Sequence, residues 1–176
     1  MANEFTDQAH IDALFGATYE ELRRLAALVR RQHQSATLNP TALVHEAWIK
    51  LSSSNGISAA SELHFKRIAA RAMRQVLIDS IRRRKTTKRG GTEDFLVTMN
   101  LSAEPVMMVE DELVALDHSL DKLAQMNPRQ ATVVESRFFG GMEMAEISEL
   151  LGISEATVLR DWRAAKAWLG QEVRRG

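Results

Sequence analysis

The chain has 176 residues, only 6% of them aromatic, and contains no cysteine. The lack of cysteine excludes disulfides and thiolate metal sites and suits a reducing cytoplasm. No apolar segment has the length of a signal peptide or a membrane span. The sequence therefore predicts a cytoplasmic protein with one medium domain or two small ones.

Apolar residues in the N-terminal half recur near the helical period in several stretches. The first predicted helix runs from Ile11 to Arg31. Asn39 and Pro40 then supply an N-cap and a proline at the first helical position for a helix from Thr41 to Leu51. After a polar loop, Ser61 begins a long helix that ends near residue 84.

The net charge of zero hides an uneven distribution of charge. Between Lys66 and Arg89 the chain has ten basic residues and one acidic residue, Asp79, whereas Glu93 to Glu112 contains six acids and no base. A helix end that complements its dipole explains about two or three cations, fewer than the six among residues 82–89. The pattern favours a polyanion-binding element followed by an acidic connector.

Residues 86 to 112 have no sustained helical period and are predicted to be a linker with at most a short helix. Two helices follow, from Glu112 to Gln125 and, after the N-cap Asn127, from Pro128 to Phe139. The predicted fold class is all-α, with two small helical domains joined by a flexible linker.

The segment from Met144 to Leu169 predicts two short helices joined by a tight turn. Gly152 supplies the left-handed conformation that ends the first helix, and Ser154 is the N-cap of the second. Each helix has an apolar face, made by Ala145, Ile147, Leu150 and Leu151 in the first and by Val158, Trp162, Ala165 and Leu169 in the second. This arrangement is typical of a helix-turn-helix, although a helical hairpin that only packs has the same pattern.

The other face of the second helix carries groups that suit DNA recognition. Polar groups at its start can meet base edges, and arginines can hold phosphates. Asp161 is expected to lie off this face or to pair with a neighbouring arginine. The candidate contacts are Ser154, Glu155, Thr157, Arg160 and Arg163.

Known catalytic and metal-binding patterns do not fit the chain. A zinc-protease motif beginning at His45-Glu46 needs a second histidine at position 49, which is Ile49. The other histidines lack ligand spacing, and the Gly-Gly pairs at 90–91 and 140–141 are predicted turns. We therefore expect a protein that is not an enzyme, with no cofactor and no metal.

Taken together, the two halves resemble the extracytoplasmic-function (ECF) sigma factors, two-domain bacterial transcription initiation factors. The run NPRQATVVESRFFGGMEMAEISELLGISEATV is similar to the family's region 4 motif. In the N-terminal half, LVHEAW at 43–48 resembles the region 2.2 core, and RQVLID at 74–79, followed by RRR, resembles the promoter-facing helix. PTALVHEAW and RDWR resemble a divergent subgroup associated with Ser/Thr kinases.

The resemblance implies region 2 at 8–87, a linker at 88–111 and region 4 at 112–175. Region 4 would bind the −35 element through the five candidate contacts and the polymerase flap through its other face. Region 2 would bind the polymerase clamp through Leu43, His45, Glu46 and Trp48, although the position of Trp48 is more typical of a core residue. Region 2 would also bind the −10 element through Asn55, Ser58, Arg71, Arg74, Gln75, Arg82, Arg83 and Arg84. The loop that contains Asn55 and Ser58 has the composition of an ordinary solvated turn as well.

Similar sigma factors carry several carboxylates just before the Leu-Val pair, where this chain has Asn39, Pro40, Thr41 and Ala42. Such an interface should bind polymerase weakly, and a phosphate on Thr41 would restore negative charge. The alternative is that these residues only start the helix and that Glu46 with apolar contacts suffices for binding.

The implied partners are core RNA polymerase (clamp and flap), promoter DNA, and either a Ser/Thr kinase or an anti-sigma factor. A stand-alone helix-turn-helix regulator with an N-terminal sensor or dimerisation domain is the other interpretation. Ten cations in and just beyond one long helix argue against it, because a sensor domain does not need them.

Overall fold

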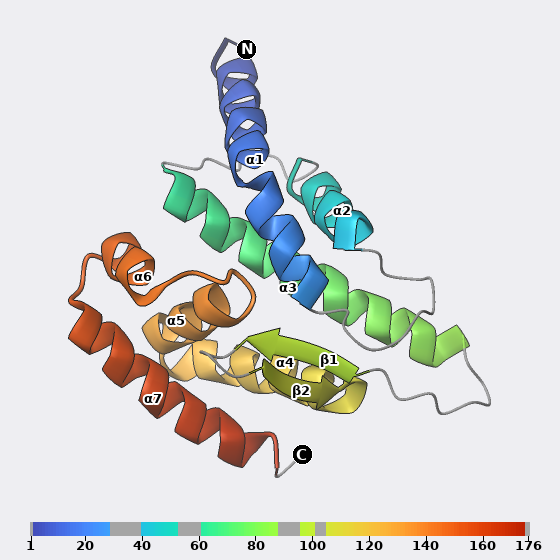
Figure 1. Ribbon diagram of the computed structural model, residues 1–176, viewed down its shortest axis with the longest axis vertical. Helices are drawn as coiled ribbons and strands as arrows, with labels where there is room; N and C mark the ends of the chain where they lie inside the picture. The colour runs from blue at the N-terminus through green and yellow to red at the C-terminus, as the bar shows by residue number, and fades with distance from the viewer. Residues whose placement is uncertain (1, 29–39, 53–60, 88–95, 101–104, 175–176) are drawn as a thin grey trace.

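The computed structural model describes residues 2–28, 40–52, 61–87, 96–100 and 105–174. Helices dominate these residues, and Figure 1 shows them as two groups that lie against each other. The N-terminal group is α1 (Ala2–Leu28), α2 (Pro40–Ser52) and α3 (Glu62–Thr87), and the C-terminal group is α4 (Glu110–Met126), α5 (Pro128–Phe138), α6 (Met144–Leu151) and α7 (Glu155–Glu172). The all-α fold class is confirmed.

Helix α3 is the scaffold of the N-terminal group, and α1 and α2 both pack on it. Its apolar face is buried through Phe65, Ile78 and Ile81. Ser61 caps the helix as predicted, since its Oγ accepts a hydrogen bond from the His64 amide at 3.2 Å. Helix α1 begins at Ala2, nine residues before the predicted start at Ile11, since the residues before Ile11 have no apolar period in the sequence that would mark an earlier start.

The connecting segment contains a β-hairpin that its sequence pattern does not predict. Strands β1 (Leu96–Asn100) and β2 (Pro105–Val109) pair antiparallel, with Leu96 opposite Val109 and Asn100 opposite Pro105. The prediction of a linker with at most a short helix is wrong for these residues. Their valines and threonine favour strands, and the two short runs carry too little periodicity to stand out.

The C-terminal group contains the predicted helix-turn-helix, in α6 and α7. Gly152 has a φ of 63° and closes α6, and the Ser154 side chain accepts a hydrogen bond from the Thr157 amide. Ile147 and Val158 are fully buried between the two helices and the rest of the group. Ala145 is exposed, contrary to prediction, because it lies at the edge of the apolar stripe rather than on its centre.

The two groups are not held apart on a tether in this structure. Helix α3 contacts α4, α5 and α6, and the buried apolar residues of both groups form one cluster. Figure 1 shows α3 lying across the C-terminal group. The long basic helix of one half is therefore partly covered by the other half.

Two glycines of the C-terminal group give opposite predictions. An alanine at Gly152 keeps a left-handed backbone and should cost about 1–2 kcal/mol of unfolding free energy, although no atom lies within 4 Å of its Cβ. An alanine at Gly170, inside α7, meets only an ordinary contact at 3.8 Å and should add about 0.5–1 kcal/mol. Equilibrium urea unfolding measures both, and a loss of equal size at the two positions would contradict this reading of the turn.

Candidate nucleic-acid interface

Helix α7 separates a buried face from an exposed one, as a recognition helix must. Val158, Trp162, Ala165 and Leu169 are buried against the C-terminal group. The structure places Ser154, Glu155, Arg160 and Arg163 on the surface, with Thr157 half-buried beside them. The Ser154 and Thr157 hydroxyls lie 2.9 Å apart at the start of the helix. Four of the five predicted −35 contacts are thus exposed on the N-cap and the first half of α7.

Asp161 interrupts the apolar face of α7 and is only 5% exposed. Its carboxylate receives two hydrogen bonds from Arg129 of α5, from Nε at 2.6 Å and from Nη2 at 3.2 Å. Hydrogen bonding to Asp161 and the negative charge of its carboxylate raise the pKa of Arg129. The expected position of Asp161 off the predicted DNA face, paired with an arginine, is confirmed, and the bidentate pair fixes α7 against α5.

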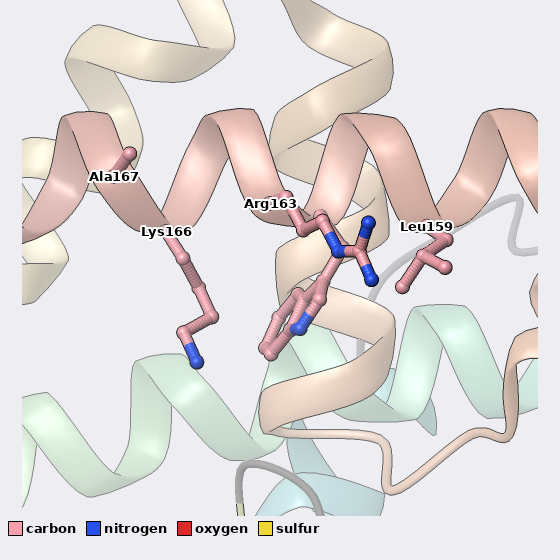
Figure 2. Close-up of a pocket in the computed structure, with 5 residues that line it drawn as sticks. Leu159, Arg163, Lys166 and Ala167 are labelled. Atoms are coloured by element: carbon pink, nitrogen blue, oxygen red, sulfur yellow. The ribbon is translucent and has the colours of Figure 1, made fainter.

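A hollow of about 520 Å³ continues the exposed face of α7 toward its C-terminal end. It is lined by Leu159, Trp162, Arg163, Lys166 and Ala167 (Figure 2). Lys166 Nζ lies 5.6 Å from the centre of the Trp162 ring, within the range of a cation–π contact. Two cations beside an apolar surface suit a sugar–phosphate backbone, which offers both kinds of contact.

Some of the predicted −10 contacts on helix α3 are exposed to solvent, and one of them, Arg74, is buried. Arg71, Gln75, Arg82 and Arg83 are exposed. Arg83 Nη2 lies 3.7 Å from the carboxylate of Glu46 on α2, so this pair is loose and solvent-exposed. The side chain of Arg84, and all of Asn55 and Ser58, lie outside the described residues.

Arg74 is buried between α3 and the C-terminal group. Its guanidinium donates to Asp117 Oδ1 at 2.8 Å, to Asp121 Oδ1 at 2.7 Å and to Glu135 Oε1 at 3.1 Å. Burial alone would lower the pKa of Arg74, but the hydrogen bond to Asp121 and the charges of Asp117 and Glu135 outweigh it and raise that pKa. In this arrangement Arg74 cannot contact DNA, contrary to the role predicted for it.

The surface predicted to face polymerase lies on α2. His45 and Glu46 are exposed, whereas Leu43 is buried and can only position the helix. Trp48 is half-buried and stacks on Phe15 with 4.3 Å between ring centres, as its core-like position indicated. Ile49 is 63% exposed and was not predicted as a site residue. Its position off the apolar stripe of α2 was the available signal.

Two further observations bear on the class of protein. Among the described residues there is no group of three or more side chains able to hold a metal ion. None of the described helices is long and apolar enough to cross a membrane.

The fold and the exposed face of α7 define a helical DNA-binding protein with a helix-turn-helix and a second, basic helix. A family model described as ECF sigma factor matches residues 4–175, nearly the whole chain. The chain belongs to this family. It is an alternative sigma factor that acts in transcription initiation, with core RNA polymerase and promoter DNA as partners, and it is not an enzyme. No curated protein and no solved structure matches the chain significantly.

Proposed function

We propose that the two halves divide promoter recognition between them, with region 2 at 8–87, a connecting segment at 88–111 and region 4 at 112–175. The observation that carries this proposal is the one-sided α7, whose polar and basic side chains are exposed while its apolar face and Asp161 are buried. Ser154, Glu155 and Thr157 at its N-terminus would meet base edges of the −35 element. Arg160 and Arg163 would hold the adjacent bases or phosphates.

Region 2 would use the exposed side of α3 for the −10 element. Arg71, Gln75 and Arg83 are exposed in the structure, and Arg82 is exposed but paired with Asp117. Arg84, Asn55 and Ser58 would also contact the −10 element, as would Arg74 once its carboxylate partners release it. The cations would bind phosphates and set the register of α3 on the promoter.

The contact with core polymerase would be made by His45 and Glu46, together with the exposed Ile49, while Leu43 and Trp48 hold α2 in place. The purified chain should comigrate with core polymerase on gel filtration. Separate elution of the chain and core polymerase, even when both are mixed at high concentration, would contradict this assignment.

We also propose that the protein works in the cytoplasm. We further propose that phosphorylation of Thr41 strengthens the contact with polymerase. The first turn of α2 contains no acidic residue, and half-buried Thr41 is its second residue. A phosphate there would carry about −1.5 to −2 charges and would suit the N-terminal end of the helix dipole. The resemblance to a kinase-associated subgroup agrees with this control, and an anti-sigma factor is the alternative.

We expect Thr41→Glu to tighten binding to core polymerase roughly fivefold, and kinase-treated wild type to bind tighter still, because a phosphate accepts more charge-assisted hydrogen bonds than a carboxylate. Fluorescence titration with core polymerase measures the affinities. Ser52→Glu is the matched control, because it adds the same charge at the exposed opposite end of α2. Tight and equal binding by the unmodified wild type and Thr41→Ala would end the phosphorylation proposal.

A further inference from the structure

The side of α3 that faces the C-terminal half carries a series of polar and small residues at four-residue spacing. Lys66, Ala70 and Arg74 follow one another along this side, and Arg82 lies two turns further on. Lys66 Nζ lies 3.1 Å from Glu146 Oε1 of α6, with its side chain only 9% exposed. Arg82 Nη2 lies 3.1 Å from Asp117 Oδ2 of α4. Cations of the proposed promoter-binding helix are thus paired with acids of the other half.

The approach of the two halves is close as well as charged. Gly140, which follows α5, lies so near α3 that a Cβ on this residue would be 3.0 Å from the Cβ of Ala70. Ala70 itself is fully buried. Arg74 also donates to the main-chain oxygen of Asp117 at 2.8 Å, so the donors of its guanidinium are bound on several sides. The interface is therefore packed and specific rather than a loose contact of two domains.

We propose that Asp117, Asp121 and Glu135 form an intramolecular lock that occupies Arg74 and Arg82 in place of promoter phosphates, so that the chain must open before α3 can engage the −10 element fully. The proposal rests on the proposed function of α3 as the promoter-facing helix. Carboxylates and phosphates bind a guanidinium through the same planar, bidentate geometry. One arginine cannot satisfy both at once.

The lock is suited to opening. Opening the lock breaks its ion pairs but returns the charged groups to water. The hydration free energy that these groups regain offsets much of the attraction that is lost. Arg71, Gln75 and Arg83 stay exposed in the closed arrangement. DNA can therefore make a first contact with α3 while Arg74 is still covered. Release of Arg74 and Arg82 would follow and would exchange carboxylates for phosphates.

The lack of cysteine allows a direct measurement of the closed arrangement. Spin labels at Ser52→Cys and Gln171→Cys, both exposed, place one probe on each half of the full-length chain. Double electron–electron resonance should give a narrow distance distribution for the otherwise wild-type chain. The lock variant Asp117→Asn/Asp121→Asn should give longer and broader distances. Asp121→Asn alone, at a side chain that is 64% exposed, should shift the distribution in the same direction without endangering the fold.

The matched control is Glu149→Gln/Glu172→Gln. It makes the same change in charge on the same half of the chain but away from the lock, since Glu149 is exposed on α6 and Glu172 is bonded to Lys122 of α4. Binding of a fluorescein-labelled, A/T-rich single-stranded DNA is measured in parallel. The lock variant should bind at least about fivefold tighter than the control variant, and adding Arg74→Ala to the lock variant should remove most of this gain.

Unchanged distances in the lock variant would overturn the lock, whatever the DNA affinities. Longer distances without tighter DNA binding would overturn the competition between carboxylates and phosphates. Failure of α3 as the promoter-facing helix is seen separately, since Arg71→Ala/Arg83→Ala would then leave transcription by the chain with core polymerase unchanged, and this result would not alter the distance measurement.

Discussion

Replacing Trp162 with alanine is expected to lower the free energy of unfolding by about 3–5 kcal/mol. The indole is 4% exposed and lies in the core that joins α7 to the rest of the C-terminal half. Its removal would leave a cavity that the bidentate Asp161–Arg129 pair prevents from collapsing fully, because that pair fixes α7 one residue away. Equilibrium urea unfolding monitored by circular dichroism measures the change.

Leu159→Ala is the control for this prediction. Leu159 lies on the same helix but is 37% exposed, so its removal should cost about 1 kcal/mol. Losses of equal size in the two variants would show that α7 is not anchored through Trp162.

Arg160→Ala is expected to weaken binding to a −35 duplex by about 1–3 kcal/mol, the usual loss for a base contact or a strong phosphate contact. Arg160 is exposed on the proposed DNA face, one turn before Arg163. Fluorescence anisotropy with a duplex carrying the −35 element measures the change. Since Arg160 lies outside the buried stripe of α7, the unfolding free energy should stay within about 0.5 kcal/mol of wild type.

The matched control is Arg174→Ala, which removes an exposed arginine just beyond the C-terminal end of α7. Its side chain bonds only locally, to the Gly170 carbonyl at 2.6 Å. An equal loss of DNA affinity in both variants would mean that the arginines act through general charge and that Arg160 has no specific place in the site.

The helix-turn-helix could be predicted because its signals are local. Gly152, Ser154 and the apolar stripe of α7 are read from neighbouring residues, and the structure has the expected turn, cap and buried face. The same holds for Asn127 and Pro128 at the start of α5, where the Asn127 side chain accepts from the Gln130 amide. Caps and periodicity depend on a few consecutive residues, so sequence alone suffices for them.

The contacts between the halves could not be predicted in this way. In the sequence Arg74 is one of many cations on a basic helix, and nothing near it in the chain indicates that its partners lie 43 to 61 residues away. The Arg129–Asp161 pair spans 32 residues and could not be predicted for the same reason. A charged residue carries no local signal of whether its partner is a phosphate or a distant carboxylate, so burial of Arg74 emerges only when the two halves pack.

Run-off transcription with core RNA polymerase on genomic DNA fragments tests promoter recognition by this chain most directly. We expect discrete transcripts from a limited set of promoters when the chain is added, strengthened by Thr41→Glu and lost in Arg160→Ala/Arg163→Ala. Transcripts that do not depend on the chain in its wild-type, phosphorylated or Thr41→Glu form would contradict promoter recognition by this protein.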